Sequence, residues 1–284
     1  MSYLTHRQLY LQRLGYDTPP PPTLQTLQAL QLRHVCTFVF ESLSTLLHLP
    51  VPIDLASVEQ KVLVEGRGGY CYELNQMFLA LLQALGFEAR GITGRVVMGG
   101  PADARTARTH RLSLVTLDGV RYITDVGFGG MVPSSPLLLD TEAVQATAHE
   151  PYRLTLDGQG SYTMWAQVAQ QWRGLYVFDL QVQADIDYTI GNWYVSTHPD
   201  SPFLGQLKVA RLAPGKRYTL ANAHYAVHYL NRPSEKRALG SADELLQVLQ
   251  ETFGLCLSQL PQLRGALDEM TDGHQDHKKP VPTP

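Results

Sequence analysis

The chain has 284 residues, of which 44% are hydrophobic and 17% are charged, and its formal net charge is −3. A chain of this length and composition can bury a core spread over two or three subdomains, which excludes global disorder. The slightly acidic balance gives no basic footprint, so no nucleic-acid partner is predicted.

The cysteines and the apolar runs bear on the compartment. Cys36, Cys71 and Cys256 are odd in number, widely spaced and without a CxxC pair. Neither a disulfide framework nor a zinc site is indicated, so no metal is predicted. The first residues show no apolar targeting segment, and no run of 18 apolar residues occurs. We therefore expect a protein of the reducing cytoplasm with no membrane partner, and the oligomeric state stays open.

The first predicted elements are helices. Thr23 and Asp54 are placed to cap two of them, and a later helix begins at Cys71 and ends at Gly86. This last helix carries one apolar stripe with a period of 3.6 residues, formed by Leu74, Met77, Phe78, Leu81, Leu82 and Leu85.

After Gly86 the apolar period changes from 3.6 to 2, which favours strands. Further strands follow after residue 206, together with a helix that Ser241 can cap. Beyond Pro261 no period is evident, which favours a disordered tail. The predicted regions are helical, mainly β, mixed α and β, and disordered, at residues 1–86, 87–190, 191–260 and 261–284.

Cys71 is a candidate nucleophile because of its position. The glycines of Gly68-Gly69 favour a turn, which places Cys71 in the first turn of the following helix. Free N–H groups and the positive end of the helix dipole favour a thiolate there, and the thiolate is the nucleophilic form. The alternative is a small buried hydrophobic residue, which is the commoner role of a free cysteine.

A hairpin brings a histidine and an aspartate together. Asp118-Gly119 lies between two apolar-rich runs and predicts a two-residue loop. In that register Leu112 faces Asp125, so His110 and Asp125 are diagonal neighbours on one face, about 7–8 Å apart at the backbone. A lone histidine or aspartate is more often a surface or turn residue. Together, beside a reactive cysteine, they fit an arrangement in which the acid orients an imidazole that takes the thiol proton.

Several blocks of the chain resemble one enzyme family in order and spacing over roughly the first half. The sequence is similar to the arylamine N-acetyltransferases, which use acetyl-CoA and a Cys-His-Asp triad. The blocks are Pro22-Thr23-Leu24, Phe40-Glu41, Arg67-Gly68-Gly69-Tyr70-Cys71-Tyr72-Glu73-Leu74-Asn75, Gly94-Arg95-Val96, Arg108-Thr109-His110 and Asp125-Val126-Gly127-Phe128-Gly129.

The resemblance implies an α+β fold with an N-terminal helical bundle, a central β-barrel and a C-terminal α/β lid around a cysteine-protease-like core. It implies that Cys71 is the nucleophile, His110 the base and Asp125 the orienting acid. Arg67 and Glu41 match a charged pair that supports the site. The resemblance also implies an aromatic acceptor pocket, for which core packing is the alternative role of each residue, and its residues are Phe40, Tyr70, Val96, Phe128 and Phe203.

One block departs from the family. The family commonly has Pro-Phe-Glu-Asn where this chain has Val39-Phe40-Glu41-Ser42. The departure puts the acceptor preference in question more than the chemistry. The CoA-contacting residues stay open, since Gly66 to Gly69 lacks the Lys-Ser/Thr of a phosphate-binding loop. The loop from Gly99 to Arg108 and the glycines at 127, 129 and 130 are weak candidates.

The expected function is ping-pong transfer of an acetyl group from acetyl-CoA through acetyl-Cys71 to arylamines or arylhydrazines, with O-acetylation of N-hydroxyarylamines left open. One alternative is a cysteine hydrolase or transglutaminase-like enzyme that uses the same three residues. A second is a non-catalytic binding module, which predicts an unreactive Cys71. Cys36 and Cys256 are expected to be inert.

Overall fold

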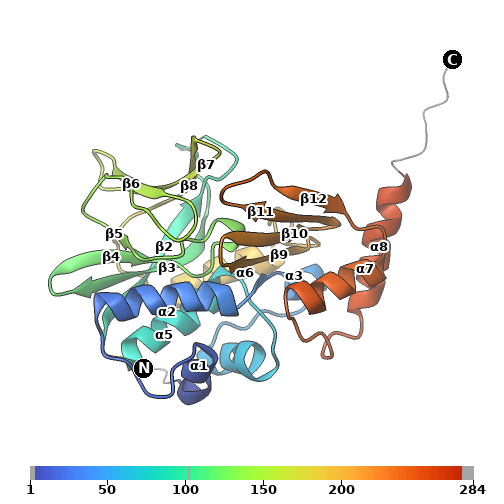
Figure 1. Cartoon of the computed structure of the whole chain (residues 1–284), viewed down its shortest axis with the longest axis horizontal. Helices are drawn as coiled ribbons and strands as arrows, with labels where there is room; N and C mark the ends of the chain where they lie inside the picture. Colours follow the sequence, from blue (N-terminus) through green and yellow to red (C-terminus); the bar gives the residue numbers. More distant parts are fainter. Residues whose placement is uncertain (1–3, 102, 277–284) are drawn as a thin grey trace.

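A computed structural model describes residues 4–101 and 103–276. Figure 1 shows helices in the lower part of the molecule, a barrel-like sheet above them, and a second sheet with two helices to one side. This mixture of helices and mainly antiparallel sheets confirms the predicted α+β class. No helix among the described residues is long and apolar enough to cross a membrane.

The N-terminal third is helical, as predicted. Thr23 Oγ1 accepts the N–H of Thr26 at 3.2 Å, and Asp54 Oδ1 accepts the N–H of Ser57 at 3.0 Å, so both predicted caps are present. The helices are α1 (Arg7–Arg13), α2 (Leu24–Thr37), α3 (Leu43–Leu46), α4 (Leu55–Glu59) with a π-helical turn (Gln60–Val64), and α5 (Cys71–Ala84).

Helix α5 is the central element of this part. Its predicted apolar stripe is buried from Leu74 to Leu85 in one core with side chains of α1 and α2. Gly86 adopts a left-handed conformation with φ of 89°, which ends the helix where the sequence predicted. This burial fixes the helix and thereby the position of Cys71 at its first residue.

A seven-stranded antiparallel sheet curves into a nearly closed barrel in the order β5-β4-β3-β2-β8-β7-β6. Gln145 bridges the gap between its edges. The main chain of Gln145 pairs with Tyr152 of β6, and its side-chain amide bonds the N–H and C=O of Leu138 of β5. The strands are β2 (Glu88–Val96), β3 (Arg108–Leu117), β4 (Val120–Thr124), β5 (Leu137–Leu138), β6 (Tyr152–Leu156), β7 (Tyr162–Val168) and β8 (Gln171–Phe178).

The predicted hairpin register is confirmed. Asp118 and Gly119 both have positive φ, 51° and 78°, as a type I′ turn requires. The paired residues run from Leu117 opposite Val120 to Ser113 opposite Thr124. Continuing this register by one residue places Leu112 opposite Asp125, so His110 and Asp125 share a face.

The C-terminal part joins a five-stranded sheet to helices. The sheet order is β1-β9-β10-β11-β12, so the short N-terminal strand β1 completes a sheet otherwise formed far along the chain. The elements are β1 (Phe40–Glu41), α6 (Asp185–Thr197), β9 (Lys208–Ala213), β10 (Lys216–Ala221), β11 (His224–Tyr229), β12 (Glu235–Ala238), α7 (Ala242–Gln247) with a π-helical turn (Val248–Thr252), and α8 (Leu263–Asp276). Helix α6 crosses the predicted limit at residue 190, and the other domain limits stay predictions.

The predicted disordered tail at residues 261–284 is wrong as far as residue 276, because α8 occupies Leu263–Asp276. Leu263 and Leu267 are buried in one apolar cluster with residues of α7, and Met270 packs against that cluster. Their spacing of four and three residues is a short helical stripe that polar neighbours obscure in the sequence. Residues 277–284 lie outside the described residues.

Candidate active site

Cys71 is the first residue of α5, at the interface between the helices and the barrel. Its N-cap is Tyr70, whose N–H donates to Glu73 Oε2 at 3.0 Å. The Cys71 side chain is 4% exposed, and its Sγ lies 3.6 Å from the carbonyl oxygen of Thr109 on β3. The thiol therefore lies at the helix N-terminus and against the strand that carries His110.

His110 and Asp125 form the pair that the hairpin predicted. His110 Nε2 lies 2.6 Å from Asp125 Oδ2, and both side chains are buried. The thiol of Cys71 is close enough to the imidazole to contribute to the raised pKa of His110. The imidazole of His110 thus lies between the thiol of Cys71 and the carboxylate of Asp125.

Asp125 has donors on both carboxylate oxygens. Oδ2 accepts from His110 and from the Tyr176 hydroxyl at 3.0 Å. Oδ1 accepts from Asn75 Nδ2 at 3.0 Å and from the Gly127 N–H at 2.9 Å. Four donors compensate the loss of water around a fully buried carboxylate and hold it in one orientation.

His110 and Asp125 each favour the charged form of the other. Burial disfavours a charged imidazole, but the Asp125 carboxylate and the Cys71 thiol together raise the pKa of His110 to about 10. Burial also opposes ionisation of Asp125, yet His110, Asn75 and Gly127 hold its pKa below the usual range. The pair is therefore an imidazolium and a carboxylate at neutral pH, next to a thiol.

Asn75 fastens the Cys71 helix to the barrel. It lies one turn after Cys71 on α5, and its Nδ2 also donates to the carbonyl oxygen of Arg111 at 2.6 Å. Its Oδ1 accepts the N–H of Val126 at 3.0 Å. Gly127 packs so closely that a Cβ there would lie 2.8 Å from the Cα of Cys71. These contacts fix the distance between the nucleophile and the hairpin.

Two members of this network have no assigned role in the sequence reasoning. Asn75 belongs to one of the resemblance blocks, and its spacing of four from Cys71 could have indicated a shared helix face. Tyr176 carries no local signal. It reaches Asp125 because β8 pairs with β2 in the barrel order, which the sequence pattern does not contain.

Three of the predicted pocket residues lie together beside Cys71. The rings of Phe40 and Phe203 have centroids 6.1 Å apart, and those of Tyr70 and Phe203 are 5.9 Å apart. Phe40 and Phe203 are half-buried and pack against the apolar cluster that contains Tyr70 and Cys71. Tyr70 is itself buried, and its hydroxyl donates to Asn192 Oδ1 on α6.

The other two predicted pocket residues belong to the barrel. Phe128 meets His110 edge to face, with ring centroids 5.0 Å apart. Val96 ends β2 and lies opposite Tyr176 of β8, so their side chains share a face. Phe128 therefore borders the imidazole directly, whereas Val96 lies opposite Tyr176, whose hydroxyl donates to Asp125.

Comparisons with known proteins identify the family of this chain. A family model described as N-acetyltransferase matches residues 23–261. An arylamine N-acetyltransferase of Mycolicibacterium smegmatis is 40% identical over 255 residues, which cover 88% of this chain and 92% of the relative. The chain belongs to the arylamine N-acetyltransferase family.

Two further members of the family are informative. A Salmonella typhimurium protein named arylamine N-acetyltransferase / N-hydroxyarylamine O-acetyltransferase is 37% identical over 247 residues, covering 87% of both chains. The structure of Mycobacterium marinum arylamine N-acetyltransferase in complex with CoA has a TM-score of 0.86 and 37% identity, covering 93% of this chain and 97% of the other. This chain is therefore an acetyltransferase with the family's fold, as the resemblance implied.

The departure from the family block has a structural counterpart. Ser42 Oγ donates to the carbonyl oxygen of Gln206 and accepts the N–H of Lys208, both at 2.8 Å. Val39 is buried, and its carbonyl oxygen accepts the N–H of Gly69 at 3.1 Å. Ser42 thus binds the start of β9 with one hydroxyl, at the position where the resemblance leads us to expect an asparagine amide.

A second buried ionic cluster lies behind the N-terminus of α5. Arg67 donates to Glu41 Oε1 through Nε and Nη2, at 3.1 and 2.7 Å. Lys61 lies 2.6 Å from Glu73 and 3.8 Å from Glu41. Burial raises the pKa of Glu73, with a further contribution from Glu41, whereas Lys61 and Arg67 outweigh burial and lower the pKa of Glu41. We read this cluster as structural support for the Tyr70–Cys71 turn.

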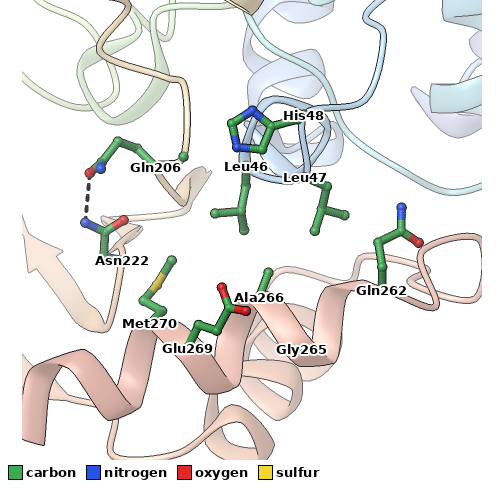
Figure 2. A pocket seen from close by; sticks show the side chains of 11 residues that line it. Leu46, Leu47, His48, Gln206, Asn222, Gln262, Gly265, Ala266, Glu269 and Met270 are labelled. Carbon is green, nitrogen blue, oxygen red and sulfur yellow. Dashed lines mark hydrogen bonds between the residues drawn. The ribbon is translucent and has the colours of Figure 1, made fainter. Parts of the chain in front are cut away.

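Two cavities lie away from Cys71. One, of about 640 Å³, is bounded by the Leu46–His48 segment and by α8, whose Ala266, Glu269 and Met270 face it in Figure 2. The other, of about 490 Å³, includes Lys61 and Arg67 in its lining. Neither contains a predicted pocket residue, so the position of the chemical groups, and not cavity size, identifies the candidate site.

No group of three His, Cys, Asp or Glu residues that could hold a metal is found within residues 4–101 and 103–276.

Proposed function

We propose that this chain transfers an acetyl group from acetyl-CoA to the amino group of an arylamine or arylhydrazine through an acetyl-Cys71 intermediate. The observation that carries the proposal is the buried His110 imidazole, which bonds to Asp125 and lies beside the Cys71 thiol at the start of α5. Family membership supports the reaction class, and the CoA bound to the Mycobacterium marinum relative supports the donor.

In the first step the Cys71 sulfur attacks the carbonyl carbon of the acetyl thioester. An imidazolium at His110 stabilises the attacking thiolate and then gives its proton to the departing CoA sulfur. Asp125 keeps the ring oriented and stabilises its charge. Backbone N–H groups at the start of α5 are the proposed donors to the tetrahedral oxyanion, because they have no partner within the helix.

In the second step the amine nitrogen of the acceptor attacks the acetyl carbonyl carbon. The neutral imidazole takes the amine proton, the C–S bond breaks, and the amide leaves with the Cys71–His110 pair restored. Phe40, Tyr70, Phe128 and Phe203, with Val96 at the barrel edge, are the proposed walls for a flat acceptor. Apolar walls also keep out water that would hydrolyse acetyl-Cys71.

The printed name of the Salmonella typhimurium relative includes N-hydroxyarylamine O-acetyltransferase, so we extend the proposal to acetyl transfer onto the oxygen of such acceptors. We also propose a cytoplasmic location. It is supported by the cysteines Cys36, Cys71 and Cys256, which are all free.

The test is the intact mass of the protein after brief exposure to acetyl-CoA without acceptor. We expect one acetyl adduct on wild type, none on Cys71→Ser, and discharge of the adduct by 4-anisidine. An unmodified wild type whose Cys71 still reacts rapidly with iodoacetamide would contradict acetyl-CoA as the donor. It would bring forward a cysteine hydrolase or a transglutaminase-like enzyme. A Cys71 unreactive toward both reagents would favour a binding module.

A further inference from the structure

Lys208 places an ammonium group at the wall of the candidate acceptor pocket. Its Nζ lies 4.8 Å from the ring centroid of Phe203, and that ring contacts those of Phe40 and Tyr70. Phe203 is a predicted pocket residue, and Lys208 follows it five residues later in the chain.

The sheet register gives independent support for this position. Phe40 of β1 lies opposite Ala210 of β9, and Ala210 lies opposite Thr219 of β10. Lys208 is two residues before Ala210, so its side chain shares a face with these three residues. A Cβ at Gly130 would lie 3.0 Å from Thr219 Cγ2, which places the loop after Phe128 against the same face. The lysine and the loop that follows Phe128 thus lie against the same face of the sheet.

Lys208 lacks an acidic partner. Across residues 4–101 and 103–276, no carboxylate oxygen lies within 4.0 Å of its Nζ. The side chain is half-buried, and burial lowers the pKa of Lys208. A cation that has lost part of its water and has no counter-ion gains most from an anionic ligand.

We propose that Lys208 makes the acceptor pocket selective for arylamines that carry a carboxylate, by pairing its ammonium with that carboxylate. The inference rests on the proposed function. A ring that bears its amino and carboxylate groups at opposite ends, as in 4-aminobenzoate, can direct the amine toward Cys71 while the carboxylate reaches Lys208. The mutually packed rings of Phe40, Tyr70 and Phe203 offer such a ring apolar and aromatic surface.

The net positive charge of the surrounding sheet also attracts an anionic acceptor, but it does not select a carboxylate over other anions. Residues 205–240 contain seven Lys and Arg but one Asp or Glu, a net charge of +6, whereas the whole chain has −3. This potential attracts any anion, including the phosphates of CoA. A control lysine on the same sheet must therefore separate local pairing from the general potential. Lys216 serves, because it lies on β10 with its Nζ over Tyr218.

The test compares 4-aminobenzoate with 4-aminobenzamide, which has the same shape and no charge. The quantity measured is the ratio of their kcat/KM values, in wild type, Lys208→Met, Lys208→Arg and Lys216→Met. We expect wild type to prefer the benzoate and Lys208→Met to lower the ratio about tenfold, as for the loss of a charge-assisted hydrogen bond. Lys208→Arg should keep most of the preference, and Lys216→Met should keep all of it.

Direct binding of both compounds, measured by calorimetry, gives the same comparison without turnover. If wild type forms no acetyl-Cys71, the proposed function fails, while a binding ratio that depends on Lys208 still supports selective recognition. An unchanged kcat/KM ratio or binding ratio in Lys208→Met would overturn the inference. A rise in the KM for acetyl-CoA with an unchanged acceptor ratio would also overturn it, and would assign Lys208 to the donor.

Discussion

Two buried ionic clusters lie near the first turn of α5, and they differ in how their charges are satisfied. On the barrel side, one acid, Asp125, accepts hydrogen bonds from four donors, and one of these donors is the titratable ring of His110. Behind α5, two acids and two bases neutralise each other around Glu41 and Glu73. Only the first cluster contacts the thiol.

The difference separates a chemical role from a supporting one. In the barrel-side cluster the charge of His110 can change during a reaction while Asp125 stays fixed, because the other three donors hold the carboxylate. In the cluster behind α5 every charge is compensated by another, so a change of protonation would leave a buried charge unpaired. The first should govern activity, and the second should govern stability.

The largest expected effect is that of Asp125→Asn. The amide keeps the shape but cannot stabilise an imidazolium and holds the ring in the wrong tautomer, so we expect kcat/KM to fall by a factor of about 10⁴. Steady-state kinetics with acetyl-CoA and 4-anisidine measure it, and circular dichroism verifies the fold. Activity within tenfold of wild type would mean that Asp125 is a structural residue.

The second effect tests the cluster behind α5. Glu41→Gln leaves Arg67 without its carboxylate in a buried position, so we expect a loss of about 3–5 kcal/mol in the free energy of unfolding. Urea denaturation measures this loss, and folded protein should keep most of its kcat. Asp243→Asn, which breaks the exposed pair with Arg264, is the control and should change stability far less. A stable Glu41→Gln that is inactive would reverse the assignment of the two clusters.

A third prediction uses pH. The pKa of His110 is raised to about 10 in the fold from its ordinary value of 6.5. Folding therefore favours the protonated ring, and this stabilisation is complete below pH 6.5 and lost as the pH rises toward 10. The stability difference between wild type and His110→Gln, from urea denaturation at each pH, should shrink over that range. A difference that grew with pH would require a neutral imidazole in the folded protein.

The smallest expected effect tests one hydrogen-bond donor of the barrel-side cluster. Tyr176→Phe removes one of the donors to Asp125, so we expect kcat/KM to fall about tenfold, the value of one hydrogen bond to a charged group. Tyr152→Phe is the matched control, because that buried hydroxyl donates to the carbonyl oxygen of Met131 and not to Asp125. Equal losses in both variants would indicate a packing effect.

The features that could be predicted from the sequence are those that residues close together in the chain determine. The His110–Asp125 pair depends on a two-residue turn, and the Asp118-Gly119 dipeptide specifies that turn within the hairpin itself. The start of the Cys71 helix and the stripe from Leu74 to Leu85 are equally local. These features are correct in the structure.

The features that were missed depend on chain segments distant in sequence. Tyr176 reaches Asp125 through strand pairing in the barrel, and Gln145 completes the barrel with a side chain in place of a strand. Lys208 shares a sheet face with Phe40 because β1 pairs with β9, more than 160 residues later in the chain. Helix α8 was missed for another reason, since its apolar stripe is stabilised by a core that α7 supplies.

The central claim is that the barrel-side cluster activates Cys71, and the most direct measurement is the rate of its alkylation by iodoacetamide as a function of pH. The rate is followed on the Cys71 peptide by mass spectrometry in wild type and Asp125→Asn. Between pH 6.5 and 8 we expect the rate to be at least about tenfold faster in wild type than in Asp125→Asn, since an imidazolium at His110 stabilises the attacking thiolate. Equal rates in the two proteins over this range would contradict activation of Cys71 by the barrel-side cluster.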